Sequence, residues 1–309
     1  QRWALVQSFT LSWVAVGCCY AGLAAAWNWR KPRARNRLLA LLLVGLNLAV
    51  WQVALETERP GVVFLDPGSG DALVLEDGLG RRALVDAGIN GTGALRDYLG
   101  ARGIRRMDLA VITHPDLDHY GGLLDLPGHF RIGTLLVATL RGDTAYRGVI
   151  GRFQGRGTRV LVGGAGTSVR LGGWTLDFIW PSAVARARFA RGMISTNDLS
   201  LVALARHGGR ALLLTGDLDE PRILADRSAT AWLLKSPHHG SRQGNPDLLF
   251  DVVRPEVVVV MGRYPTPAGL EERLACGGLT YVNTRRDGAW QLVFQGERVR
   301  EIPYRPARF

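Results

Sequence analysis

The sequence contains little cysteine and almost no lysine. Its three cysteines are Cys18 and Cys19, which lie in an apolar stretch, and Cys276, which stands alone. Such a set excludes a disulfide framework and a zinc site built from thiolates. Lysine occurs only at Lys31 and Lys235, so arginine supplies nearly all of the 38 positive charges, against 27 negative ones. The formal net charge of +11 favours an anionic partner such as nucleic acid or acidic lipid, although a genome rich in arginine codons explains it equally well.

Charge is also missing from two long stretches near the start of the chain. Residues 3–27 and residues 38–55 contain no charged side chain over 25 and 18 positions. A helix that spans a bilayer needs about 20 apolar residues, and a water-soluble core helix rarely lacks a charged face for so long. We therefore expect two transmembrane helices in a first domain, 1–57, with a buried helical hairpin as the alternative.

The loop between these two stretches predicts their orientation. It contains five cations, which the positive-inside rule places in the cytoplasm: Arg30, Lys31, Arg33, Arg35 and Arg37. A second domain, 58–309, is then expected outside the cytoplasmic membrane. The chain starts at Gln1 directly in apolar sequence, so we expect the C-terminal part of a longer, multi-pass membrane protein, whose other helices would also influence the orientation.

The second domain reads as an α/β structure. Short β-branched segments separated by glycines follow residue 60 and are typical of strands. Apolar residues at helical spacing predict helices over 92–104 and 143–157. The turn 207–209 predicts one hairpin, and residues 281–296 predict a closing hairpin. Strands dominate both halves, which indicates a four-layer αββα sandwich of two sheets with helices outside.

Side chains that bind metals recur where the predicted strands end. Loops at strand ends are where a rigid scaffold assembles a site. Asp118 and His119 follow one strand together and can reach the same metal. Asp217 in LTGD and one of His238 and His239, with His239 favoured, complete a set of nitrogen and oxygen ligands. Such a set with an open coordination position suits a metal that activates water for hydrolysis.

Several motifs resemble known families. THPDLDHYGGL, LLLTGD and LKSPHHGS, in this order and spacing, resemble the metallo-β-lactamase superfamily. Together with FLDPGSGDALVLEDG, NDLSLV and RDGAW, they resemble the ComEC/Rec2 family of DNA-uptake channels. The resemblance implies an extracytoplasmic nuclease that degrades one strand of DNA while the other enters the cell during natural transformation. It also implies DNA, single-stranded DNA above all, the membrane and the rest of the uptake channel as partners.

The chain departs from the superfamily at its first metal position, which normally takes three histidines and a bridging aspartate. His114 remains, Asp116 replaces the second histidine, and Asn197 and Asp198 stand where the third is expected. A carboxylate in place of an imidazole favours Mn²⁺, or Mg²⁺, over Zn²⁺. Alternatively, the first position holds no metal, and one site is then more consistent with the sequence than two. The ammonium of Lys235, placed near Asp116, would supply the missing charge and contact the scissile phosphate.

Three residues are expected to act in catalysis. Asp118 orients the attacking water, Lys235 stabilises charge on the phosphoryl oxygens, and a protonated His238 assists the leaving oxygen. Four others are expected to support the site from behind the ligands: Asp71, Asp86, Asn197 and Ser241. Of these, Asp86 is expected to orient a ligand histidine through its other ring nitrogen.

The remaining polar residues have weaker signals. His129 and His207 are expected to be bystanders, and Arg141, Arg147, Arg152 and Arg242 are candidates for contacts with DNA phosphates. Two other functions remain open. One is a phosphodiesterase that acts on a small or cell-envelope substrate, and the other is a non-catalytic module that binds DNA or gates the channel.

Overall fold

The computed structural model describes most of the chain. The described residues are 20, 22–23, 32–57, 59–225, 227, 229–267, 269–296 and 298–303. The boundary between two compact units falls between Arg59 and Pro60. In the first unit, the described part is mainly the helix α2 (Pro32–Thr57), and the predicted span 38–55 falls within it. The predicted span 3–27 lies outside the described residues except at Tyr20, Gly22 and Leu23. Among the residues that the structure describes, no helix has both the length and the apolar character needed to cross a membrane.

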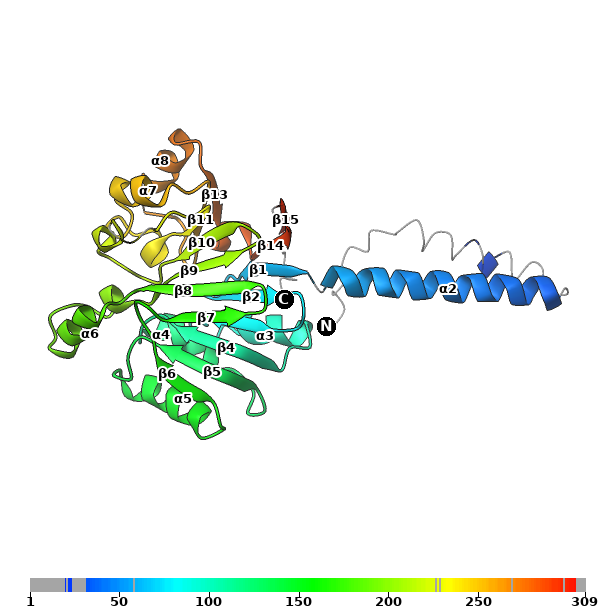
Figure 1. Cartoon of the computed structure of the whole chain (residues 1–309), viewed down its shortest axis with the longest axis horizontal. Helices are drawn as coiled ribbons and strands as arrows, with labels where there is room; N and C mark the ends of the chain where they lie inside the picture. Colours follow the sequence, from blue (N-terminus) through cyan, green and yellow to red (C-terminus); the bar gives the residue numbers. More distant parts are fainter. Residues whose placement is uncertain are drawn as a thin grey trace. The chain divides into compact units, whose positions relative to one another are not determined.

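The second unit contains two sheets (Figure 1). Within the described residues, the first sheet has eight strands in the order β15-β14-β1-β2-β3-β4-β5-β6. Its strands β3 to β6 run parallel, and its other neighbours are antiparallel. The strand bounds are β1 (Pro60–Phe64), β2 (Leu73–Asp77), β3 (Arg82–Val85), β4 (Arg106–Ile112), β5 (Arg131–Val137), β6 (Arg159–Val162), β14 (Trp290–Gln295) and β15 (Arg298–Pro303).

The second sheet has seven strands in the part that the structure describes, in the order β13-β12-β11-β10-β9-β8-β7. Strands β10 to β13 run parallel, and β7 to β10 form an antiparallel meander. The strand bounds are β7 (Ser168–Leu171), β8 (Trp174–Trp180), β9 (Val202–His207), β10 (Arg210–Leu214), β11 (Leu233–Lys235), β12 (Val257–Val260) and β13 (Thr280–Asn283). The hairpin predicted at 207–209 is confirmed, because His207 pairs with Arg210 across the turn.

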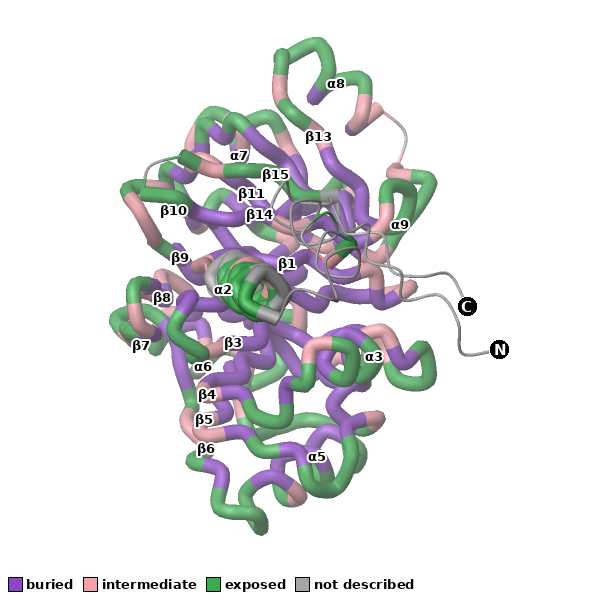
Figure 2. Tube along the Cα trace, turned by 90° about the vertical axis from the view of Figure 1, so that its right-hand side faces the viewer, coloured by how far each residue is buried: buried purple, intermediate pink, exposed green. Residues whose placement is uncertain are grey.

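Apolar side chains on the inner faces of both sheets form the central core. Phe64 and Leu75 of the first sheet share one cluster with Trp174, Phe178 and Leu214 of the second. Strand residues alternate between faces, so the outer faces need their own cover. The strands are mostly buried, and the helices have exposed outer turns (Figure 2).

The helices supply that cover. Leu95 of α3 and Tyr146 of α5 pack on the outer face of the first sheet, and Leu249 of α7 packs on that of the second. The predicted α/β sandwich of two sheets with outer helices is therefore confirmed. The helix bounds are α3 (Ala94–Ala101), α4 (Leu117–Tyr120), α5 (Thr144–Gln154), α6 (Ala183–Ala190), α7 (Asp247–Val253), α8 (Leu270–Cys276) and α9 (Thr284–Asp287).

The closing hairpin predicted over 281–296 is wrong. Its two strands, β13 and β14, belong to different sheets. Between them, the side chain of Asn283 accepts hydrogen bonds from the backbone N–H groups of Arg285 and Arg286 and so begins the short helix α9. This capped turn carries the chain from one sheet to the other, whereas a tight hairpin would have kept it in the same sheet.

Candidate metal centre

Strand ends from both sheets deliver the polar residues of the candidate site. In the first sheet, Asp86 follows β3 and His114 follows the parallel strand β4. In the second sheet, Asp217 follows β10 and His239 follows the parallel strand β11. Parallel strands present their carboxyl ends at the same edge, where open α/β sheets place their ligands. The fold therefore gathers residues that lie more than a hundred positions apart in the sequence.

Two imidazoles and two carboxylates converge at this edge. Nε2 of His119 lies 3.2 Å from Oδ2 of Asp217, and Nε2 of His239 lies 3.1 Å from the same oxygen. Nε2 of His239 also lies 3.4 Å from Oδ2 of Asp118. The ligand atoms of Asp118, His119 and His239 all lie within 4.8 Å of one another. This is the set that the sequence predicts for a retained metal, with His239 as the favoured histidine.

The contacts of Nδ1 in His119 and His239 indicate whether Nε2 of each ring is free to bind a metal. Nδ1 of His119 lies 2.9 Å from Oδ2 of Asp86, and Nδ1 of His239 lies 3.1 Å from the carbonyl oxygen of Met261. If each Nδ1 donates its hydrogen to that acceptor, each Nε2 presents a lone pair to Asp217. Neither Nε2 has a hydrogen-bond partner among the described residues. Lone pairs that face a buried carboxylate require a cation between them, so this donor set fits a divalent metal.

Electrostatics show the same demand for positive charge. Burial disfavours the charged form of both histidines, but Asp217 more than offsets it, with help from Asp86 at His119, and the pKa values of His119 and His239 rise well above their usual range. Burial raises the pKa of Asp118, but the nearby imidazoles of His239 and His119 lower it to about 2. The carboxylates therefore stay ionised and attract either protons or a metal to the imidazoles.

Asp86 lies where the sequence analysis expects it, on the ring of a candidate ligand. Besides its contact with His119, its carboxylate accepts hydrogen bonds from the backbone N–H of Thr113 at 2.8 Å and from the Thr113 hydroxyl at 2.7 Å. Asp86 itself has a left-handed backbone with φ of 56°, which is uncommon for a residue other than glycine. Thr113, which the sequence analysis overlooked, has no signal other than its position beside His114.

Lys235 is buried beneath the candidate centre with a relative exposure of 1%. Its ammonium contacts Oδ2 of Asp71, donates to the carbonyl oxygen of Gly216 at 2.9 Å and lies 3.7 Å from Oδ1 of Asp217. Burial lowers the pKa of Lys235, but Asp71 and Asp217 more than reverse this and raise it. Burial raises the pKa of Asp71, but Lys235, together with His239 and His119, more than reverses this and lowers it.

The expected pair of Lys235 with Asp116 is therefore wrong, whereas the expected contact of Lys235 with phosphate stays a prediction. Lys235 ends the central strand β11 and points into the interior, where its partners are Asp71 and Asp217. Asp116 instead precedes α4, with its Oδ2 at 3.5 Å from Nε2 of His114 and 3.3 Å from the Thr196 hydroxyl. Lys235 acts on the site through the carboxylates that it neutralises.

Comparison with known proteins agrees with this architecture. Residues 65–262 match the sequence profile of the Metallo-beta-lactamase superfamily. The chain belongs to the metallo-beta-lactamase superfamily. One solved structure, the "CmlA beta-hydroxylase E377D mutant", is similar with a TM-score of 0.51 and 16% sequence identity, over 76% of this chain and 54% of that one. At this identity, the likeness shows the fold alone.

The resemblance to the competence family is confirmed by two relatives. "Competence protein ComA" of Neisseria gonorrhoeae is 28% identical over 279 residues, which are 82% of this chain and 37% of that protein. "ComE operon protein 3" of Bacillus subtilis (strain 168) is 25% identical over 181 residues, which are 55% of this chain and 22% of that protein. The matched region thus spans well under half the length of either relative.

In this metallo-beta-lactamase domain, the first metal position of the superfamily is only partly preserved. His114 is fully buried, its Nδ1 lies 3.1 Å from the Thr113 hydroxyl, and its Nε2 has no hydrogen-bond partner among the described residues. Its ligand atom lies within 4.8 Å of those of His119 and Asp217, whereas Asp116 belongs to no such group in the described chain. The structure therefore places His114 at the centre and Asp116 at its edge.

His238 belongs to no group of candidate ligands in the described chain, which favours His239 as the histidine of the pair that binds metal. Both His238 and His239 have positive φ values, 44° and 52°, and their rings lie 5.9 Å apart, centroid to centroid. Nδ1 of His238 lies 2.6 Å from Oδ1 of Asp219, and the side-chain amide of Asn197 donates to Oδ2 of Asp219 at 3.0 Å. Asp219 was overlooked in the sequence, although it stands two residues after Asp217.

The other candidates form contacts with residues outside the gathered ligands. The hydroxyl of Ser241 accepts a hydrogen bond from the backbone N–H of Gly244 at 3.1 Å and so belongs to a turn. His129 is exposed, and His207 stacks against Trp174 with 4.9 Å between ring centroids. Arg152 donates to three backbone carbonyls, among them that of Leu126, and so braces a loop.

Proposed function

We propose that this domain is a metal-dependent nuclease that hydrolyses phosphodiester bonds of DNA. Membership of the superfamily supports a metal-dependent hydrolase, and the names of the competence relatives favour DNA as the substrate. One observation carries the proposal: the unpartnered Nε2 atoms of His119 and His239 converge on the carboxylate of Asp217, beside Asp118. A bound divalent cation would polarise a phosphoryl oxygen and make water nucleophilic near neutral pH.

The proposed centre holds one metal rather than two. Asp118, His119, Asp217 and His239 would hold it, and two oxygen with two nitrogen donors suit Mn²⁺ as well as Zn²⁺. Lys235 already supplies a positive charge to Asp71 and Asp217 behind the candidate ligands, which reduces the need for a second cation to balance these carboxylates. Asp116 lies apart from the gathered ligand atoms in the described residues. Mn²⁺ is the favoured ion because the chain has lost two of the three histidines of the first position.

The remaining residues have roles that follow from their contacts. Asp118 is half-buried and ionised, so it can accept a hydrogen bond from the attacking water and orient it. His238 is partly exposed at the rim, and Asp219 fixes its ring, so His238 is suited to pass a proton to the leaving oxygen. Lys235 holds the carboxylates in place.

The same proposal places the domain at the outer face of the cytoplasmic membrane, as the nuclease part of a DNA-uptake channel. The described leucines of α2 are largely exposed, for example Leu41 at 63%, Leu43 at 64% and Leu48 at 58%. An exposed apolar surface of this kind needs lipid or protein to cover it. The cations of the preceding loop favour a cytoplasmic position for that loop.

A cleavage assay on the full chain in detergent tests the proposal. Labelled single-stranded DNA is incubated with Mn²⁺, Mg²⁺ or Zn²⁺, and His239→Gln is compared with the exposed control His129→Gln. We expect cleavage by the parent and by His129→Gln, and loss of cleavage in His239→Gln. Retained DNA binding with no cleavage under any metal would instead indicate a non-catalytic module. Cleavage of a small phosphodiester dye but not of DNA would indicate the small-substrate phosphodiesterase.

A further inference from the structure

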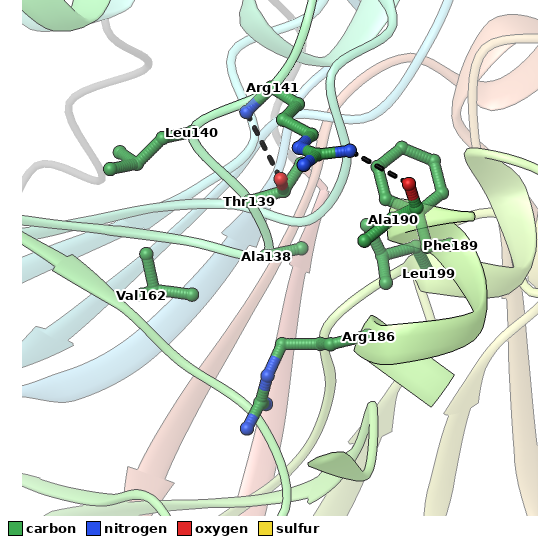
Figure 3. A pocket seen from close by; sticks show the side chains of 9 residues that line it. All are labelled: Ala138, Thr139, Leu140, Arg141, Val162, Arg186, Phe189, Ala190 and Leu199. Carbon is green, nitrogen blue, oxygen red and sulfur yellow. Dashed lines mark hydrogen bonds between the residues drawn. The ribbon is translucent and has the colours of Figure 1, made fainter. Parts of the chain in front are cut away.

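Nine residues line a cavity of ≈ 230 Å³ (Figure 3). The segment after β5, the strand β6 and the helix α6 form its walls. Leu140 and Val162 face it from the first sheet, and Phe189 and Leu199 close it from the opposite side. The volume is below the range of about 300–1,000 Å³ that drug-sized ligands occupy, so it suits a single ring system.

Topology places the segments that line this cavity next to the candidate metal centre. Strands β4, β5 and β6 are parallel neighbours, so the loop after β5 leaves the same edge as the loop that carries His114. On the opposite wall, Leu199 precedes Ser200, whose hydroxyl lies 3.4 Å from Nδ1 of His114. In the same segment, the Thr196 hydroxyl lies 3.3 Å from Asp116. The cavity therefore adjoins the side of the centre where a histidine has been replaced.

The lining is apolar with cationic groups at its border. Leu140 and Val162 remain 52% and 49% exposed, so apolar surface is left open to solvent. Arg141 and Arg186 donate to backbone carbonyls, Arg141 to that of Ala190 at 2.9 Å. Neither arginine forms an ion pair with a carboxylate in the described chain. Their positive charges are thus available to an anion, and the exposed guanidinium of Arg141 is the more accessible one.

We propose that this cavity binds one unpaired nucleobase of the DNA strand being cleaved, with the adjoining phosphate on Arg141. The inference rests on the proposed nuclease function and adds a substrate subsite to it. Every base has an apolar face that can lie against Phe189, Leu140 or Val162, and a flanking phosphate supplies the anion that Arg141 attracts.

The lining of the subsite also predicts which form of DNA binds there. The hydroxyl of Thr139 already accepts from the backbone N–H of Arg141 at 3.0 Å, and its carbonyl accepts from the Tyr146 hydroxyl at 2.7 Å. With these polar groups engaged, the walls offer little that distinguishes one base from another. A base must leave its stack to enter, and unstacking is easiest in single strands. The cavity therefore favours single-stranded DNA without a sequence preference.

Binding measurements on the full chain in EDTA test the subsite without cleavage. The probes are a fluorescent single-stranded oligonucleotide and the same backbone with abasic sites. Phe189→Ala is expected to weaken binding of the normal strand about tenfold and to leave binding of the abasic strand unchanged. Leu140→Asp, at an exposed position, is expected to weaken binding of the normal strand far more than Leu79→Asp does. Leu79 is 85% exposed and does not line the cavity, so it controls for the change in charge.

Three outcomes separate the subsite from the nuclease function. Loss of binding to the normal strand alone supports the subsite. Equal effects of Leu140→Asp and Leu79→Asp, together with equal effects of Phe189→Ala on normal and abasic strands, overturn the subsite and leave the nuclease function standing. Failure of the parent chain to bind either strand overturns both. Because Phe189 packs partly against the core, thermal melting of Phe189→Ala is measured in parallel. If Phe189→Ala is unfolded, the comparison of Leu140→Asp with Leu79→Asp decides the result.

Discussion

The ammonium of Lys235 contacts the carboxylate of Asp71 in the interior of the domain, with both side chains almost completely buried. The pair lies directly behind the candidate metal ligands, because Lys235 also approaches Asp217 and Asp71 lies 3.4 Å from Nδ1 of His239. A single lysine thus connects the stability of the fold to the charge of the metal centre.

Replacing Lys235 by methionine should lower the free energy of unfolding by about 3–5 kcal/mol, because the buried carboxylate of Asp71 is left without a partner. Denaturant unfolding in EDTA, followed by tryptophan fluorescence, measures the change. The double variant Lys235→Met/Asp71→Asn removes both charges and should recover most of the loss. Additive losses in the double variant would show that the two side chains are not energetically coupled.

Asp86→Asn should weaken metal binding by about 10- to 100-fold, since the carboxylate that fixes Nδ1 of His119 is lost. Competition with a fluorescent chelator measures the affinity. Asp125→Asn is the matched control, because Asp125 accepts a hydrogen bond from the exposed backbone N–H of Gly91 and lies in none of the candidate metal groups of the described residues. Equal affinities for the two variants would remove Asp86 from the metal centre.

The two adjacent histidines should separate metal binding from catalysis. His239→Gln is expected to lose the metal, whereas His238→Gln should keep it and lower kcat by about 10²–10⁴-fold, the usual contribution of a general acid. Asp219→Asn should behave like a milder His238→Gln, because Asp219 holds the His238 ring. Loss of the metal in His238→Gln would contradict this assignment and show that His238 is itself a metal ligand.

The sequence predicts which candidate ligands gather at one site, and the reason is physical. Asp118, His119, Asp217 and His239 each follow a strand, and parallel strands bring such positions together whatever lies between them. Asp86 is predictable on the same ground. The two-sheet sandwich likewise follows from the strand pattern.

Other features depend on three-dimensional contacts that local sequence does not encode. The partners of Lys235 depend on which side of β11 faces the interior. The sequence motifs do not show this side, so they do not reveal that Lys235 pairs with Asp71 and not with Asp116. The closing hairpin fails because Asn283 caps a turn that crosses between sheets. The cavity at Leu140 and Phe189 has no motif at all, since its walls come from segments that meet only in the folded chain.

The most direct test of the proposed centre counts its metal. The 309-residue chain is loaded with excess Mn²⁺ or Zn²⁺, desalted and analysed by mass spectrometry for metal per chain, together with His114→Ala and His119→Ala. A single metal per chain that survives His114→Ala and disappears in His119→Ala is the predicted result. Two metals per chain, falling to one in His114→Ala, would show that the first position is occupied and that Lys235 does not take the place of a cation.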